Sequence, residues 1–112
     1  MDNIKEDNYY LNKVLNDLHF INKHMKNINF ESFKENELLL DSMLFRLIQI
    51  HENIRRLSMQ FKIDHSSIPW FEISGIRNRI VHDYGNVDLE IVYLTLVNDI
   101  SRLVCLFEET IV

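Results

Sequence analysis

Apolar residues recur along the first half of the chain at the three- and four-residue steps that bury one face of an α-helix. The first stripe predicts a long helix and consists of Leu11, Val14, Leu15, Leu18, Ile21 and Met25. Asn27-Ile28-Asn29 breaks this pattern, and residues 30–36 are expected to form a polar connection with aromatic anchors. The second stripe predicts another helix, followed by a loop over residues 62–67, and it consists of Leu40, Met43, Leu44, Leu47, Ile50, Ile54, Leu57 and Phe61.

Two further helices are predicted in the second half of the chain. Pro69 suits a first helical turn, where its missing N–H would have no partner, so a third helix should run from Pro69 to Tyr84. Gly85 is placed to end that helix in a left-handed conformation. Asp88 is the expected N-cap of the last helix, whose apolar residues are Leu89, Val92, Tyr93, Leu96, Ile100, Leu103, Leu106 and Phe107.

The scarcity of turn residues determines the expected fold class. The 112 residues suffice for one hydrophobic core, and they include only two Gly and one Pro. Such a composition favours a few long helices with short connections. We therefore expect an all-α, antiparallel (up-and-down) four-helix bundle that forms a single domain over residues 1–112.

Composition and charge restrict the classes of function. No apolar run approaches the roughly 20 residues that span a bilayer, and the first residues lack the order of a signal peptide. Cys105 is the one cysteine, which excludes an intramolecular disulfide and a zinc finger. We expect a cytoplasmic protein that does not contact a membrane. The net charge of −5 argues against a passive nucleic-acid coat, but a nuclease can concentrate positive potential in one cleft.

The segment from Arg77 to Tyr84 contains the candidate chemistry. Arg77 and Arg79 supply permanent forked cations suited to phosphate. His82 supplies a side chain that exchanges protons near neutral pH. These are the two groups needed to break a phosphodiester without a metal, so the sequence implies neither a metal nor a cofactor.

Together with the predicted helices, this segment resembles the HEPN-domain proteins of the HepT type. The signature of that family is an Arg, four residues, a His, one residue and a Tyr, and here it is Arg77, His82 and Tyr84. The resemblance covers about residues 38–110 and includes Ile68-Pro69-Trp70, Gly75-Ile76 and Val87-Asp88. It departs from the family in the second helix, where His51 and Asn53 replace an expected Gly and Ala.

The resemblance implies a function and a set of partners. It implies an all-α HEPN domain acting as a homodimeric toxin, a metal-independent endoribonuclease directed at RNA such as tRNA. It further implies a minimal nucleotidyltransferase antitoxin that silences the toxin by transferring AMP to Tyr84. The alternative is a non-catalytic HEPN module that binds a nucleotidyltransferase partner or a nucleotide.

The roles of the individual residues leave alternatives open. Arg77 and His82 point about 140° apart on an ideal helix, so the helix distorts, the Arg77 side chain wraps round, or the site forms across a dimer axis. In the alternative in which these residues are structural, Arg77 forms an ion pair with Glu72 or Asp83 and His82 caps the C-terminus of the helix. Tyr84 is then a buried side chain held by one hydrogen bond from its hydroxyl.

Five other residues are also assigned roles, some with an alternative. Asn78 is expected to support the site, and Arg79 either binds RNA or is solvated. Glu52 either orients the motif or is a partly exposed carboxylate. Trp70 and Phe71 are expected to anchor their helix to the bundle, with base stacking by Trp70 as the lesser alternative.

Overall fold

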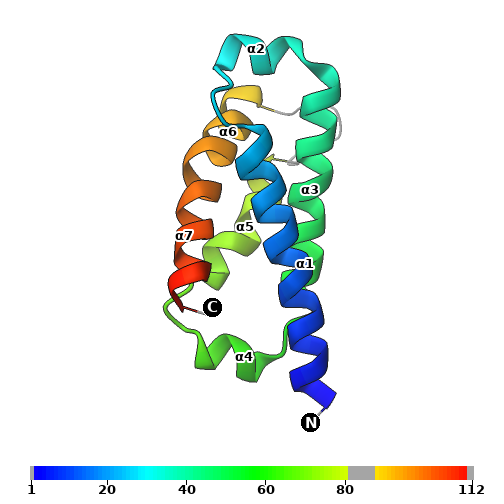
Figure 1. Ribbon diagram of the computed structural model, residues 1–112, viewed down its shortest axis with the longest axis vertical. Helices are drawn as coiled ribbons and strands as arrows, with labels where there is room; N and C mark the ends of the chain where they lie inside the picture. The colour runs from blue at the N-terminus through cyan, green and yellow to red at the C-terminus, as the bar shows by residue number, and fades with distance from the viewer. Residues whose placement is uncertain (1, 81–87, 111–112) are drawn as a thin grey trace.

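The computed structural model describes residues 2–80 and 88–110, which contain helices and no strand (Figure 1). In chain order the elements are α1 (Asp2–His24), α2 (Phe30–Glu35), α3 (Glu37–Arg55), α4 (Met59–Asp64), α5 (Trp70–Ile80), α6 (Leu89–Leu94), the π-helical turn η1 (Thr95–Asp99) and α7 (Ile100–Thr110). The all-α prediction is confirmed for this part of the chain.

The long helices pack side by side, and the short helices α2 and α4 lie at opposite ends of the molecule (Figure 1). Helix α1 packs against α3 and α7, α3 packs against α5, and α5 also contacts α6. The α1 stripe is confirmed, because its residues lie in the core or, for Leu15, against it. The same holds for the apolar stripe of α3 and, apart from the half-buried Leu89, for that of the last helix. The most buried members of these stripes include Met43, Leu96, Ile100 and Phe107.

The connection between the first two long helices contains a short helix, α2, where the sequence predicts a polar connection. Asn27 adopts a left-handed φ of 62°, which ends α1 as expected. Asn29 then caps α2 by accepting a hydrogen bond from the Ser32 backbone N–H at 2.8 Å. Phe33 is fully buried, so the aromatic anchor expected in this segment is present on a capped helical turn.

The second predicted helix is divided, which corrects the expectation that its stripe continues to Phe61. Helix α3 ends at Arg55 and α4 begins at Met59. Ser58 lies between them in an extended conformation, and its side chain accepts from the Phe61 backbone N–H at 3.1 Å. Asp7 of α1 fixes Ser58 by accepting its backbone N–H at 2.7 Å and its hydroxyl at 2.6 Å. Residues 62–64, expected in a loop, belong to α4.

The last helix begins as predicted and contains an irregular turn. The Asp88 carboxylate accepts from the backbone N–H groups of Glu90 and Ile91, which confirms the N-cap. The π-helical turn η1 then lies between α6 and α7. A wider turn accommodates the two successive four-residue steps from Val92 to Leu96 to Ile100, which would drift out of phase on an ideal α-helix. All three side chains are fully buried.

Candidate functional site

Helix α5 is anchored to the molecule by its first residue and by one apolar face. The Trp70 indole N–H donates to the backbone carbonyls of Lys62 and His65, each at 3.1 Å. Its ring lies edge-on to Phe107, with the centroids 5.9 Å apart. The prediction that Trp70 anchors this helix is therefore confirmed. Ile73 and Ile76 are buried on the same helix, which fixes the rotation of α5 about its axis.

The first residues of the Arg/His motif lie on this anchored helix. The backbone of Arg77, Asn78 and Arg79 belongs to the last described turn of α5. Their side chains, together with His82, Tyr84 and Gly85, lie outside the described part of the structure. The roles assigned to the motif thus remain predictions, as do the three ways of bringing Arg77 and His82 together.

Glu52 lies on α3, the helix that packs against α5. Its carboxylate is 3.9 Å from the Arg55 guanidinium, and 42% of the Glu52 side chain is exposed. An exposed ion pair at this distance contributes little to stability. Glu52 is therefore a partly exposed carboxylate on the helix that packs against α5. Its role in orienting Arg77 or His82 remains a prediction.

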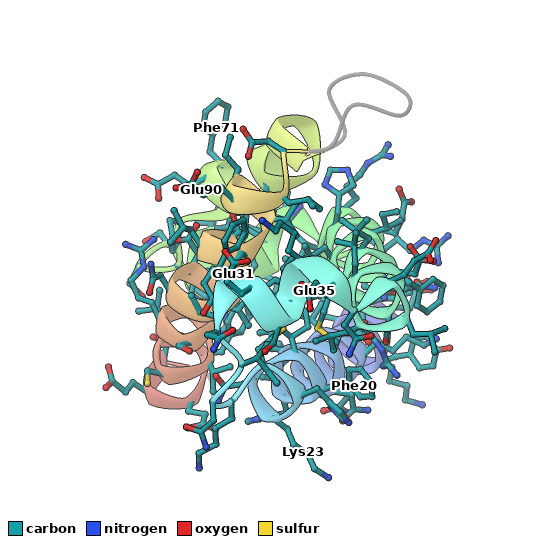
Figure 2. All side chains as sticks on the ribbon, turned by 90° about the horizontal axis from the view of Figure 1, so that it is seen from above. Phe20, Lys23, Glu31, Glu35, Phe71 and Glu90 are labelled. Carbon is teal, nitrogen blue, oxygen red and sulfur yellow. The ribbon has the colours of Figure 1, made fainter. Side chains whose placement is uncertain are left out.

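Phe71 does not anchor α5, which corrects the sequence-based expectation. The side chain is 91% exposed, and it projects outward from the molecule in Figure 2. The position of Phe71 around the helix, relative to the buried residues of α5, explains this orientation. Phe71 precedes the buried Ile73 by two residues, about 200° around the helix, and therefore points away from the core.

Phe71 forms part of the wall of a groove that lies between α5 and the segment formed by the end of η1 and the start of α7, and the sequence did not predict this groove. The groove has a volume of about 320 Å³. Its α5 side includes Phe71, Glu72, Gly75 and Ile76, and its other side includes Asp99, Arg102 and Leu103. The Glu72 carboxylate and the Arg102 guanidinium are 4.0 Å apart, with both side chains about two-thirds exposed or more.

A match to a protein family identifies the chain. The family described as "Ribonuclease HepT-like" matches residues 14–109, a range that includes α5 and the whole Arg/His motif. The chain belongs to the HepT-like ribonuclease family. The resemblance inferred from the motif is confirmed.

Several named proteins are similar to this chain over most of its length. "Putative RNase TTE0752" from Caldanaerobacter subterraneus subsp. tengcongensis is 32% identical over 94 residues, which are 84% of each chain. "Probable ribonuclease HepT" from Thermococcus cleftensis is 28% identical over 100 residues, which are 89% of this chain and 91% of that protein. A longer Methanocaldococcus jannaschii protein, "Gamma-glutamylcyclotransferase and putative RNase MJ0434", is 29% identical over 99 residues, or 45% of its length. No solved structure matches the chain.

Among the described residues, no group of three His, Cys, Asp or Glu side chains is placed to hold a metal ion. None of the helices in the described ranges is long and apolar enough to cross a membrane.

Proposed function

We propose that the protein is a metal-independent endoribonuclease, the toxin of a HEPN/minimal-nucleotidyltransferase toxin–antitoxin system, and that it acts on tRNA. Membership of the HepT-like ribonuclease family, with an intact Arg77, His82 and Tyr84, supports this proposal most strongly. A non-catalytic module that only binds a partner would not need the guanidinium, imidazole and phenol of this motif together.

The motif suits cleavage that uses the ribose 2′-OH as the nucleophile. A base removes the 2′-OH proton, the O2′–P bond forms, and the P–O5′ bond breaks as an acid protonates the departing oxygen. His82 serves as the base or the acid. Arg77 holds the phosphate and stabilises the charge that develops on its oxygens. Asn78 and Arg79, in the same turn of α5, support or bind the RNA.

A homodimer of HEPN-type four-helix bundles would solve the geometric problem posed by the motif. Arg77 lies on a regular helical turn of α5, and a residue five positions further points about 140° away if the helix continues. A two-fold axis near the motif would bring two copies into one cleft, so Arg77 of one protomer could act with the partner's histidine. Doubling the cationic groups would also help a chain of net charge −5 to bind RNA.

The same register suggests how the antitoxin would silence the toxin. Tyr84 is seven residues from Arg77 and would lie within about 20° of it on a continued helix. Transfer of AMP from ATP to the Tyr84 phenol oxygen, with loss of the phenol proton and release of pyrophosphate, would place an anionic phosphate beside the guanidinium that binds the substrate. The partner that makes this transfer would be a minimal nucleotidyltransferase.

Cleavage of end-labelled tRNA in EDTA tests the proposal. The wild-type protein is compared with Arg77→Ala and His82→Ala, after its intact mass shows that Tyr84 is unmodified. We expect cuts by the wild type and a loss of about 10²–10⁴ in rate in His82→Ala. His19→Ala is the matched control, because His19 is exposed on α1 and pairs with Glu108 at 3.5 Å. The His19→Ala variant should cut tRNA at the wild-type rate.

Two results would contradict the proposal. No cutting of several RNAs by the unmodified wild type would favour the non-catalytic module that binds a nucleotidyltransferase. Cutting that survives both motif substitutions would place the activity elsewhere or in a contaminant.

A further inference from the structure

The open face of α5 has the features of a site for an RNA base. Phe71 presents a 91% exposed ring at the lip of the groove between α5 and α7. Aromatic side chains in such positions stack unpaired bases, with a gain in affinity for every base. Trp70, the adjacent aromatic residue, is occupied by two hydrogen bonds and by its contact with Phe107. Phe71 is therefore the aromatic residue in this segment that is placed to stack a base.

Gly75 keeps the groove open one turn beyond Phe71. Glycine within a helix lowers stability compared with alanine, yet a Cβ at this position would meet no atom of the described residues within 4 Å. Packing against neighbours therefore does not require glycine at this position. A longer side chain would occupy the space beside the Phe71 ring.

The charged groups of the groove favour a base over a phosphate. Glu72 and Asp99 supply two carboxylates, and Arg102 supplies one guanidinium. This balance would repel a phosphate. Carboxylates accept hydrogen bonds from exocyclic amino groups, such as N4 of cytosine, whereas uracil presents a carbonyl oxygen at the same position.

We propose that this groove binds one unstacked, amino-bearing base of the RNA substrate, with Phe71 as the stacking platform. The inference rests on the proposed ribonuclease function. Phe71 is six residues before Arg77 on α5, about 9 Å along the helix axis and about 120° around it, so the RNA strand would pass partly round the helix between the two. Stacked nucleotides rise about 3.4 Å each, so the bound base would lie a few nucleotides from the phosphate held by Arg77. Phe71 would then contribute to the choice of substrate without taking part in bond breaking.

Binding of fluorescein-labelled 2′-O-methyl octamers, followed by fluorescence anisotropy in EDTA, tests the inference separately from cleavage. These probes cannot be cut, because their 2′ oxygens have no proton to lose. We expect Phe71→Ala to bind the octamer of cytidines about 5- to 150-fold more weakly than the wild type. Phe71→Trp should restore binding. Tyr9→Ala, which removes an exposed aromatic side chain from α1, should bind like the wild type.

Two further comparisons examine the groove itself. Gly75→Leu should weaken binding of the cytidine octamer while the protein stays folded, because the new side chain enters the groove from an open position. The wild type should bind the cytidine octamer about two- to tenfold more tightly than the uridine octamer. Equal or tighter binding of uridines would overturn the inference.

Other outcomes distinguish the failure of this inference from the failure of the proposed function. If the wild type cuts tRNA and Phe71→Ala binds the octamer equally well, the base site is refuted and the ribonuclease stands. If Phe71→Ala instead changes the molar mass measured by light scattering, the groove is a protein interface and the base site is refuted. If the wild type neither cuts nor binds RNA, both proposals fail.

Discussion

The ion pair between Asp17 of α1 and Arg46 of α3 should show an asymmetric response to removal of its two members. The Arg46 guanidinium donates to the Asp17 carboxylate at 2.7 Å, and it lies 3.8 Å from the centroid of the Phe20 ring. The Asp17 side chain is 10% exposed, whereas 30% of the Arg46 side chain is exposed. Water can therefore reach Arg46 more readily than Asp17.

The cost of each substitution follows from this difference in exposure. Arg46→Ala leaves a nearly buried carboxylate without its cation, which costs about 3 kcal/mol, and the lost contact with Phe20 adds about 0.5–1 kcal/mol. Asp17→Ala leaves a cation that can turn toward water, so it forfeits mainly the charge-assisted hydrogen bond, about 2 kcal/mol. Replacing both residues by Asp17→Leu with Arg46→Met should recover stability to within about 1 kcal/mol of the wild type.

Urea denaturation followed by circular dichroism measures these differences in the free energy of unfolding. The exposed pair between Glu31 and Lys34, 3.5 Å apart, provides the control, and Glu31→Ala should cost less than about 0.5 kcal/mol. The reasoning from burial is refuted if Arg46→Ala costs no more than Asp17→Ala. It is also refuted if both single substitutions cost less than about 1 kcal/mol.

Two further predictions concern stability. Gly75→Ala should raise the free energy of unfolding by about 0.5–1 kcal/mol in urea denaturation, because alanine favours the helix and the new methyl group meets none of the described residues within 4 Å. A loss of stability would contradict the open space at this position. Asp7→Ala should lower the free energy of unfolding by about 2–4 kcal/mol, because it removes a buried carboxylate together with its two hydrogen bonds to Ser58 and leaves the Ser58 backbone N–H without its acceptor. Ser58→Ala keeps that backbone bond and should cost less by the same measurement, so a reversal of this order would show that Asp7 acts through another contact.

Periodicity in the sequence predicted the helices and their buried faces, because the three- and four-residue steps directly encode which side of a helix is apolar. It failed at the junction of α3 and α4. Leu57 and Phe61 continue the apolar stripe, so the local pattern gives no sign of a break. The break depends on Ser58 and its hydrogen bonds to Asp7, 51 residues earlier in the chain. A contact so distant in sequence is invisible to a local pattern.

The candidate site shows the same division between local and distant information. The spacing of Arg77, His82 and Tyr84 is a local signal and led to the correct family. The orientation of Phe71 is also encoded locally, in its helical phase relative to Ile73. Its aromatic character alone suggests an anchor like the adjacent Trp70, which is why the prediction for Phe71 was wrong. The groove could not be predicted, because Asp99 and Arg102 come near Glu72 and Gly75 only through the packing of η1 and α7 near α5.

Gly75 allows stability and binding to be separated at one position. If glycine were present only by chance, both alanine and leucine should stabilise α5 and leave every activity unchanged, since both are good helix formers and the position is open. If the groove holds a base, Gly75→Leu should be at least as stable as the wild type and yet bind RNA more weakly. A loss of binding in a protein that has become no less stable cannot be attributed to unfolding. The opposite signs of the two effects would therefore indicate that the helix gives up stability at Gly75 to keep the groove open.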